Sequence, residues 1–124
     1  QQIREYTRAK FAFSQTRRFA SQRFTKEMIA GAPYASQAVR ERIAPMLATN
    51  VAAFEHWAEQ GLIAKLNFTQ LMFSIWALSQ GYVDQHTQFA LLLGKPQLDA
   101  ADYAQADALL VAMLSATLKI DLAD

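Results

Sequence analysis

Trp76 and Gln80, one helical turn apart, are the side chains of this sequence best suited to hold a small molecule. Residues four apart lie on one face of a helix, and here Phe73, Ala77 and Asp84 share that face. An indole ring can stack on a flat heterocycle, and a buried carboxamide needs partners for two donors and two acceptors. The spacing therefore predicts either a pocket for a planar polar ligand or a polar pair at the surface. The residues alone leave both open.

A second pair, Arg4 and Arg8, has the same spacing and would add a cationic partner for such a ligand.

Catalytic and metal-binding patterns are missing. The sequence contains no cysteine, and His56 and His86 lie too far apart to form a helical metal-binding pair. It also lacks a glycine-rich phosphate loop and a Gly-x-Ser-x-Gly elbow. We therefore expect no enzyme, no cofactor and no metal ion.

The elements that must position these residues all read as helices. Apolar residues recur at helical spacing, and no stretch alternates long enough to predict a strand. Breaks fall at Gly31-Ala32-Pro33, Gly61 and Gly94-Lys95-Pro96. With 124 residues, 52% of them hydrophobic, the chain is expected to form one all-α domain. The expected helices cover residues 1–15, 17–31, 35–60, 67–86 and 99–119, with a short helical turn or loop at 87–93.

Three local signals refine this prediction. Asn67 and Asp99 each stand three residues before a polar side chain, the pattern of a helix N-cap or capping box. Pro45 falls inside the third expected helix, where it should bend the axis or split the helix in two.

The last two long helices have more apolar surface than one core needs. Residues 67–86 are apolar nearly all round, which is typical of a helix buried on two sides. The final helix carries an alanine every four residues, a row that permits close helix approach. We expect a homodimer through these helices, with plain intramolecular packing as the alternative. The predicted interface residues are Leu71, Ile75, Leu78, Tyr82, Ala104, Ala108, Leu109 and Ala112.

Charge is distributed unevenly along the chain. Residues 1–42 hold nine basic and three acidic side chains, whereas residues 43–124 hold three basic and eight acidic ones. A basic half can indicate nucleic-acid binding, but the basic residues alternate with apolar ones along two helices, which favours ordinary solvated faces. The longest apolar run is far shorter than the roughly 20 residues of a membrane span, and no secretory signal opens the chain. We expect a cytoplasmic protein without a membrane partner.

Several short motifs resemble the C-terminal domain of TetR-family transcriptional regulators. They are the run at residues 3–10, Ala20-Ser21, Glu27-Met28, Ala30-Gly31-Ala32-Pro33, Trp57 and the signature Trp76-Ala77-x-x-Gln80-x-Tyr82-x-Asp84. The resemblance implies an all-α domain of five to six helices whose last two long helices form a four-helix bundle in a dimer. It implies DNA binding only through an N-terminal helix-turn-helix domain that is absent from this chain.

The resemblance also implies a site for a small-molecule effector, made of Arg4, Arg8, Phe11, Met28, Phe73, Trp76, Ala77 and Gln80. Related domains carry a lysine where this chain has Arg4. The resemblance implies a pyrimidine-like ligand. Because a guanidinium can bind a carboxylate with two parallel hydrogen bonds, Arg4 makes a carboxylated molecule the other expected ligand. The alternative is a helical protein–protein interaction module without a small-molecule ligand.

Overall fold

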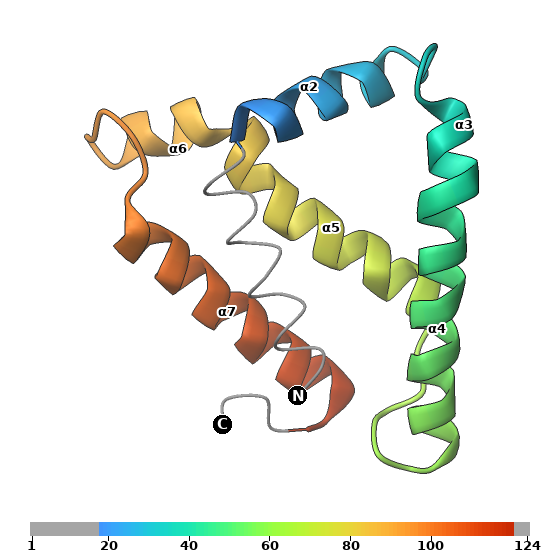
Figure 1. Cartoon of the computed structure of the whole chain (residues 1–124). Coiled ribbons are helices and arrows are strands. Elements are labelled where there is room, and N and C mark those ends of the chain that lie inside the picture. The colour runs from blue at the N-terminus through green and yellow to red at the C-terminus, as the bar shows by residue number, and fades with distance from the viewer. Residues whose placement is uncertain (1–17, 121–124) are drawn as a thin grey trace.

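The computed structural model describes residues 18–120, and every element in this range is a helix (Figure 1). In chain order these are α2 (Arg18–Ile29), α3 (Ser36–Ala38), the π-helical turn η1 (Val39–Ile43), α4 (Ala44–Glu59), α5 (Phe68–Asp84), α6 (His86–Leu92) and α7 (Ala100–Leu118). The prediction of an all-α fold is confirmed. The helix expected at 1–15 lies outside the described residues.

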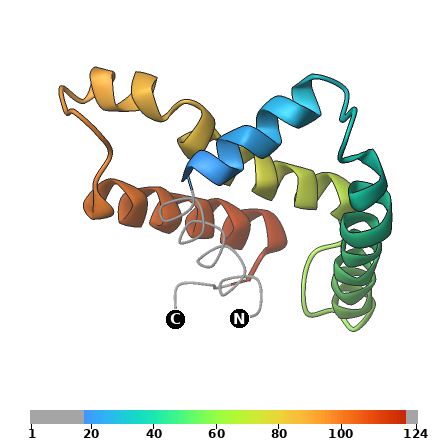
Figure 2. The same ribbon diagram turned by 45° about the horizontal axis from the view of Figure 1, so that its top comes forward.

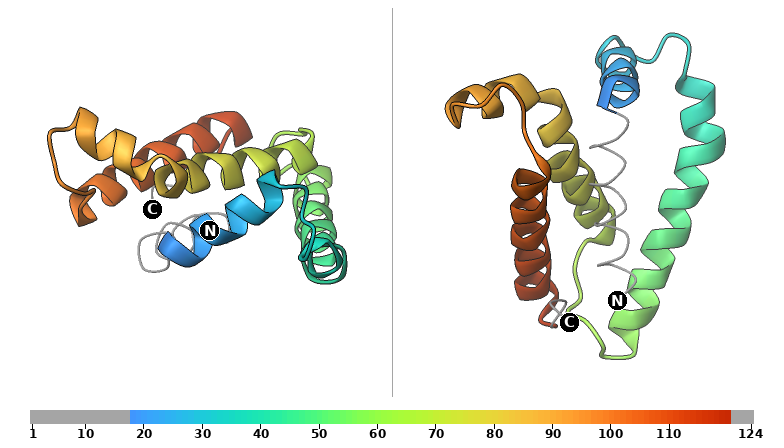
Figure 3. Two further views of the ribbon diagram at one scale, coloured as in Figure 1. Left: turned by 90° about the horizontal axis from the view of Figure 1, so that it is seen from above. Right: turned by 60° about the vertical axis from the view of Figure 1, so that its left-hand side comes forward.

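Helix α5 occupies the centre of the fold. Seen from above, α2 and α7 lie on opposite sides of it (Figure 3), and α4 crosses its N-terminal end (Figure 2). Its buried face joins the core cluster to which α4, α6 and α7 also contribute. The most deeply buried side chains of the cluster are Phe68, Met72, Ile75, Ala90, Leu110 and Leu118.

Glycines end three of the helices, as the sequence predicts. Gly31, Gly61 and Gly94 adopt φ angles of 91°, 76° and 70° directly after helical segments. This left-handed conformation is costly for residues with a Cβ and free for glycine.

Helix 67–86 is shorter than expected, because α5 ends at Asp84 and α6 begins at His86. The segment 87–93, expected as a short helical turn or loop, is helical and belongs to α6, a separate helix. His86 is buried, and its Nε2 accepts a hydrogen bond of 3.2 Å from the backbone N–H of Leu98. This bond holds the loop before α7 against the start of α6.

Pro45 neither splits the third helix nor ends it. Helical structure continues from Ser36 to Glu59, and Pro45 stands in the first turn of α4, directly after η1. There the backbone N–H of Ala44 bonds to the carbonyl of Val39, five residues back. A π-type turn changes the hydrogen-bond register locally, so the missing N–H of a proline is accommodated within a continuous helix.

Both predicted N-caps are confirmed. Asn67 accepts a hydrogen bond of 3.1 Å from the backbone N–H of Gln70 at the start of α5. At the start of α7, Asp99 and Asp102 form a reciprocal capping box, each accepting from the other's backbone N–H. Lys95 adds ion pairs of 3.0 Å to Asp99 and 2.9 Å to Asp102.

This cluster shifts two of its ionisation equilibria. The hydrogen bonds to Asp102 and Asp99 raise the pKa of Lys95 above its ordinary value. The backbone N–H of Asp102, and after it the Lys95 ammonium, lower the pKa of Asp99.

The residues predicted at a dimer interface separate into two groups. Leu71 and Ile75 are buried in the core of the chain itself, and Tyr82 is half-buried, with its ring 5.4 Å from that of Phe89. Leu78 on α5 is exposed. On α7 the exposed residues are Leu109, Ala104, Ala108 and Ala112. Between residues 18 and 120 no helix is long and apolar enough to cross a membrane.

Candidate functional site

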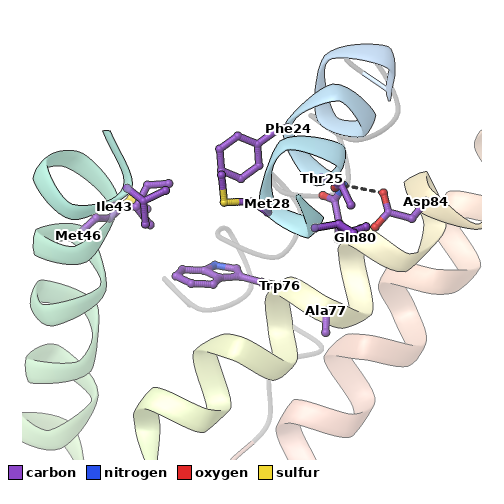
Figure 4. A pocket seen from close by; sticks show the side chains of 11 residues that line it. Phe24, Thr25, Met28, Ile43, Met46, Trp76, Ala77, Gln80 and Asp84 are labelled. Atoms are coloured by element: carbon purple, nitrogen blue, oxygen red, sulfur yellow. Dashed lines mark hydrogen bonds between the residues drawn. The ribbon is translucent and has the colours of Figure 1, made fainter. Parts of the chain in front are cut away.

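A cleft of about 480 Å³ lies where α2, the η1–α4 segment and α5 face one another (Figure 4). Volumes of this order are usual for small-molecule sites. The lining side chains are mostly apolar: Phe24, Thr25, Met28, Ile29, Val39, Ile43, Met46, Trp76, Ala77, Gln80 and Asp84. Figure 4 shows the Trp76 indole projecting from α5 into the gap between α2 and α4.

Four of the predicted ligand-binding residues meet at this cleft. Met28 comes from α2, and Trp76, Ala77 and Gln80 come from α5. Phe73 does not line the cleft; it is exposed, and its ring packs against that of Trp76 with centroids 5.9 Å apart. The other three predicted residues, Arg4, Arg8 and Phe11, lie outside the described residues.

Seven lining residues were not assigned to the site from the sequence. Asp84 shares the helical face of Trp76 and Gln80, but its position on that face alone does not predict contact with a ligand. Thr25 precedes Met28 by three residues, so the i, i+3 rule could have found it. Val39, Ile43 and Met46 also follow helical spacing, but nothing local indicates that their face meets α5 rather than another helix.

The polar part of the cleft is one hydrogen-bonded group centred on Gln80. Its Nε2 donates to Thr25 Oγ1 at 3.0 Å and to Asp84 Oδ1 at 3.1 Å. An ionised carboxylate only accepts, so the amide nitrogen, rather than the oxygen, must face Asp84. The carboxamide therefore links α2 to α5 and orders one wall of the cleft.

A second bond joins the same two helices nearby. Gln22 Nε2 donates to the carbonyl of Val83 at 2.9 Å. Together with the bond from Gln80 to Thr25, it ties α2 to the C-terminal half of α5. Any molecule that competes for Gln80 therefore acts on the contact between two helices.

Among the described residues the cleft is open on one side rather than sealed. Phe24 and Met46 are each 45% exposed and Ile29 is 81% exposed. These side chains form the rim of a groove rather than the wall of an enclosed cavity.

The described residues hold no group of three or more histidine, cysteine, aspartate or glutamate side chains that could bind a metal ion. Ser79 does not line the cleft; it is buried, and its hydroxyl donates to the carbonyls of Ile75 and Trp76 within α5. The arrangement suits reversible binding of a flat molecule: apolar walls, one indole face and a polar edge.

Comparison with known proteins assigns nearly the whole chain to one family. Residues 1–121 match the family described as "YcdC-like protein, C-terminal region". Three relatives, from Escherichia coli strain K12, Escherichia coli O157:H7 and Shigella flexneri, are named HTH-type transcriptional regulator RutR. Each is 30% identical over 103 residues, which cover 83% of this chain and 49% of the relative. The chain thus spans about half the length of the curated relatives it matches.

Proposed function

Because this chain belongs to the TetR family of transcriptional regulators, as a C-terminal region of the YcdC-like type, we propose that it is the effector-sensing and dimerisation domain of a repressor. The observation that supports an effector site most directly is the cleft beside Trp76 and Gln80. The cleft has a volume of about 480 Å³ and mostly apolar walls. Its polar side chains, Thr25, Gln80 and Asp84, form a single hydrogen-bonded cluster.

The proposed ligand is small, planar and polar. Trp76 offers a ring face for stacking, and Gln80 offers a carboxamide at the edge of the same space. From the family resemblance, the candidates are pyrimidine-like or carboxylated molecules, the latter if Arg4 reaches the cleft. Arg8 and Phe11 complete the proposed set of binding residues, and Phe73 supports the Trp76 ring from outside the cleft.

The proposed mechanism is a population shift. A ligand that touches α2, α4 and α5 together favours the packing of these helices that it fits best. In the whole protein, that packing would set the separation of two helix-turn-helix domains, whose half-sites on DNA lie about 34 Å apart. DNA binding would belong to that other domain, and this chain would carry neither catalytic nor cofactor chemistry.

The proposed dimer uses the exposed face of α7. Ala104, Ala108 and Ala112 let a second helix approach closely, while Leu109 and Leu78 supply apolar area. Standard interfaces bury about 1,600 Å² in total. A repressor that must reach operator DNA would work in the cytoplasm.

The test is calorimetric titration of the protein with uracil, thymine and orotate, a carboxylated pyrimidine. Saturable binding of at least one of them, lost when Gln80 is replaced, would support the effector site. No binding of any planar compound tested would count against it.

A second candidate function rests on the open rim. Because Phe24, Ile29 and Met46 are exposed, the groove could hold an apolar helix of a partner protein instead of a small molecule. Selection from a displayed library of amphipathic helices separates the two proposals. A helix that occupies the cleft, with no response to planar compounds, would favour the interaction module.

A further inference from the structure

The hydrogen bonds of Gln80 restrict what the polar edge of the cleft can still do. A carboxamide has two N–H donors and one carbonyl oxygen, which can accept two hydrogen bonds. Both donors are used, one by Thr25 and one by Asp84. The Oε1 atom accepts no bond from any described residue, so what Gln80 still offers is an acceptor.

Asp84 adds further acceptor capacity beside it. One carboxylate oxygen takes the bond from Gln80, and the other remains open at the exposed end of the cleft. Among the described lining residues Asp84 is the single charged side chain, so this edge carries negative charge. The Thr25 hydroxyl, which accepts from Gln80, is the one group of the cluster that can also donate.

The position of Asp84 gives a second reason to connect it with binding. It is the last residue of α5, where the helix dipole disfavours a carboxylate. An asparagine there would keep the bond from Gln80 without that penalty. Helix stability therefore does not explain the acid at this position.

We infer that the edge of the ligand that meets Gln80 and Asp84 carries hydrogen-bond donors, so that this edge of the cleft prefers an amide or a cationic amidine to a carboxylate of the same shape. This rests on the proposed function, because it specifies the ligand class of the same cleft. An N–H pair could satisfy Gln80 Oε1 and Asp84 together. A carboxylate in the same place would face two acceptors and a like charge.

Three flat probes of nearly equal size test the inference: benzamidine, benzamide and benzoate. They differ chiefly in the group at one edge. Benzamidine carries a cation that donates hydrogen bonds, benzamide a neutral amide that donates them, and benzoate an anion that only accepts them. Binding is followed by NMR of methionine methyl groups. Met28 and Met46 line the cleft, whereas Met72 is buried in the core and Met113 lies on α7. Site binding should shift the first two signals and leave Met113 unchanged.

The expected order is benzamidine, then benzamide, then benzoate, with about 25-fold between the first and last. A single partly exposed charge contributes roughly fivefold in either direction, favouring the cation and opposing the anion. In Asp84→Asn, benzamidine should weaken by about fivefold and the difference from benzoate should largely disappear. The matched control, Glu59→Gln, removes one negative charge at the exposed end of α4 and should leave the order unchanged.

The outcomes separate this inference from the proposed function. Benzoate binding as tightly as benzamidine, with shifts at Met28 and Met46, would overturn the donor preference and leave an effector site in place. An unchanged order in Asp84→Asn would overturn the role of Asp84. The absence of any shift at Met28 and Met46 with all three probes would count against the site and the inference together. An unfolding midpoint of Asp84→Asn equal to or above that of the parent would show that the variant is folded.

Discussion

Gln80 Nε2 lies 3.0 Å from Thr25 Oγ1, across 55 residues of chain. This bond joins the helix that carries Trp76 to the helix that carries Met28. The side chain best suited to recognise a ligand is thus also part of the contact that sets the width of the cleft. Ligand binding at Gln80 and the position of α2 are coupled for that reason.

Thr25→Val should lower the free energy of unfolding by about 0.5–1.5 kcal/mol, because Gln80 loses an acceptor between α2 and α5. Urea denaturation measures the change. The control, Thr49→Val, removes an exposed hydroxyl that bonds only to Pro45 within its own helix, and it should cost less than about 0.5 kcal/mol. Equal losses in the two variants would mean that the bond does not hold the helices together.

Gln80→Ala should weaken binding of a planar amide-type ligand by about 1–3 kcal/mol, or roughly 5- to 150-fold, because the ligand edge loses its partner. Calorimetry with the tightest ligand found gives the ratio. Gln70→Ala is the control, since Gln70 is exposed on the first turn of the same helix. A ligand that binds Gln80→Ala as well as the parent would place its polar edge elsewhere.

Ala108→Glu should convert a dimer into monomers, because it puts a charge and extra volume in the row through which α7 helices would approach. Sedimentation velocity at micromolar concentration distinguishes a 13.9 kDa monomer from a dimer. Ala48→Glu makes the same change at an exposed position of α4 and should leave the dimer intact. A parent protein that is monomeric at high micromolar concentration would contradict the proposed interface.

Gly81→Ala should raise the free energy of unfolding by about 0.5–1 kcal/mol. Gly81 lies inside α5, and an added Cβ would meet no atom of residues 18–120 within 4 Å. An added Cβ at Gly61 also meets no atom of the described residues, but φ there is +76°, so Gly61→Ala should destabilise by about 1–2 kcal/mol. Destabilisation by Gly81→Ala would indicate that the space beside it is filled in solution, for example by a partner.

Acid should weaken the start of α7 through Asp99. Its folded pKa is lowered, so its charge stabilises the fold above the ordinary aspartate pKa of about 3.9 and loses that effect as the pH falls through the lowered value. Asp99→Asn keeps an N-cap side chain but not the charge. The difference in unfolding midpoint between parent and variant should be present at pH 6 and shrink as the pH falls below the ordinary aspartate pKa of about 3.9. A difference that stays constant with pH would exclude the charge as its cause.

The local features of this protein could be predicted from the sequence. Gly31, Gly61 and Gly94 end helices because only glycine adopts positive φ without strain, and Asn67 and Asp99 cap helices through bonds that span three residues. The shared face of Trp76, Ala77 and Gln80 follows from helical periodicity alone. In each case the cause lies within one or two turns of chain.

Only the tertiary structure decided which face of each helix packs against which neighbouring helix. Leu71, Ile75 and Leu78 are similar apolar residues of one helix, yet the first two are buried in the core and the third is exposed. The width and open side of the cleft, and the acceptors it presents, depend on where α2 and α4 lie against α5. Periodicity shows that a helix has an apolar face, but the partner of that face is chosen by packing between segments far apart in the chain, such as Thr25 and Gln80.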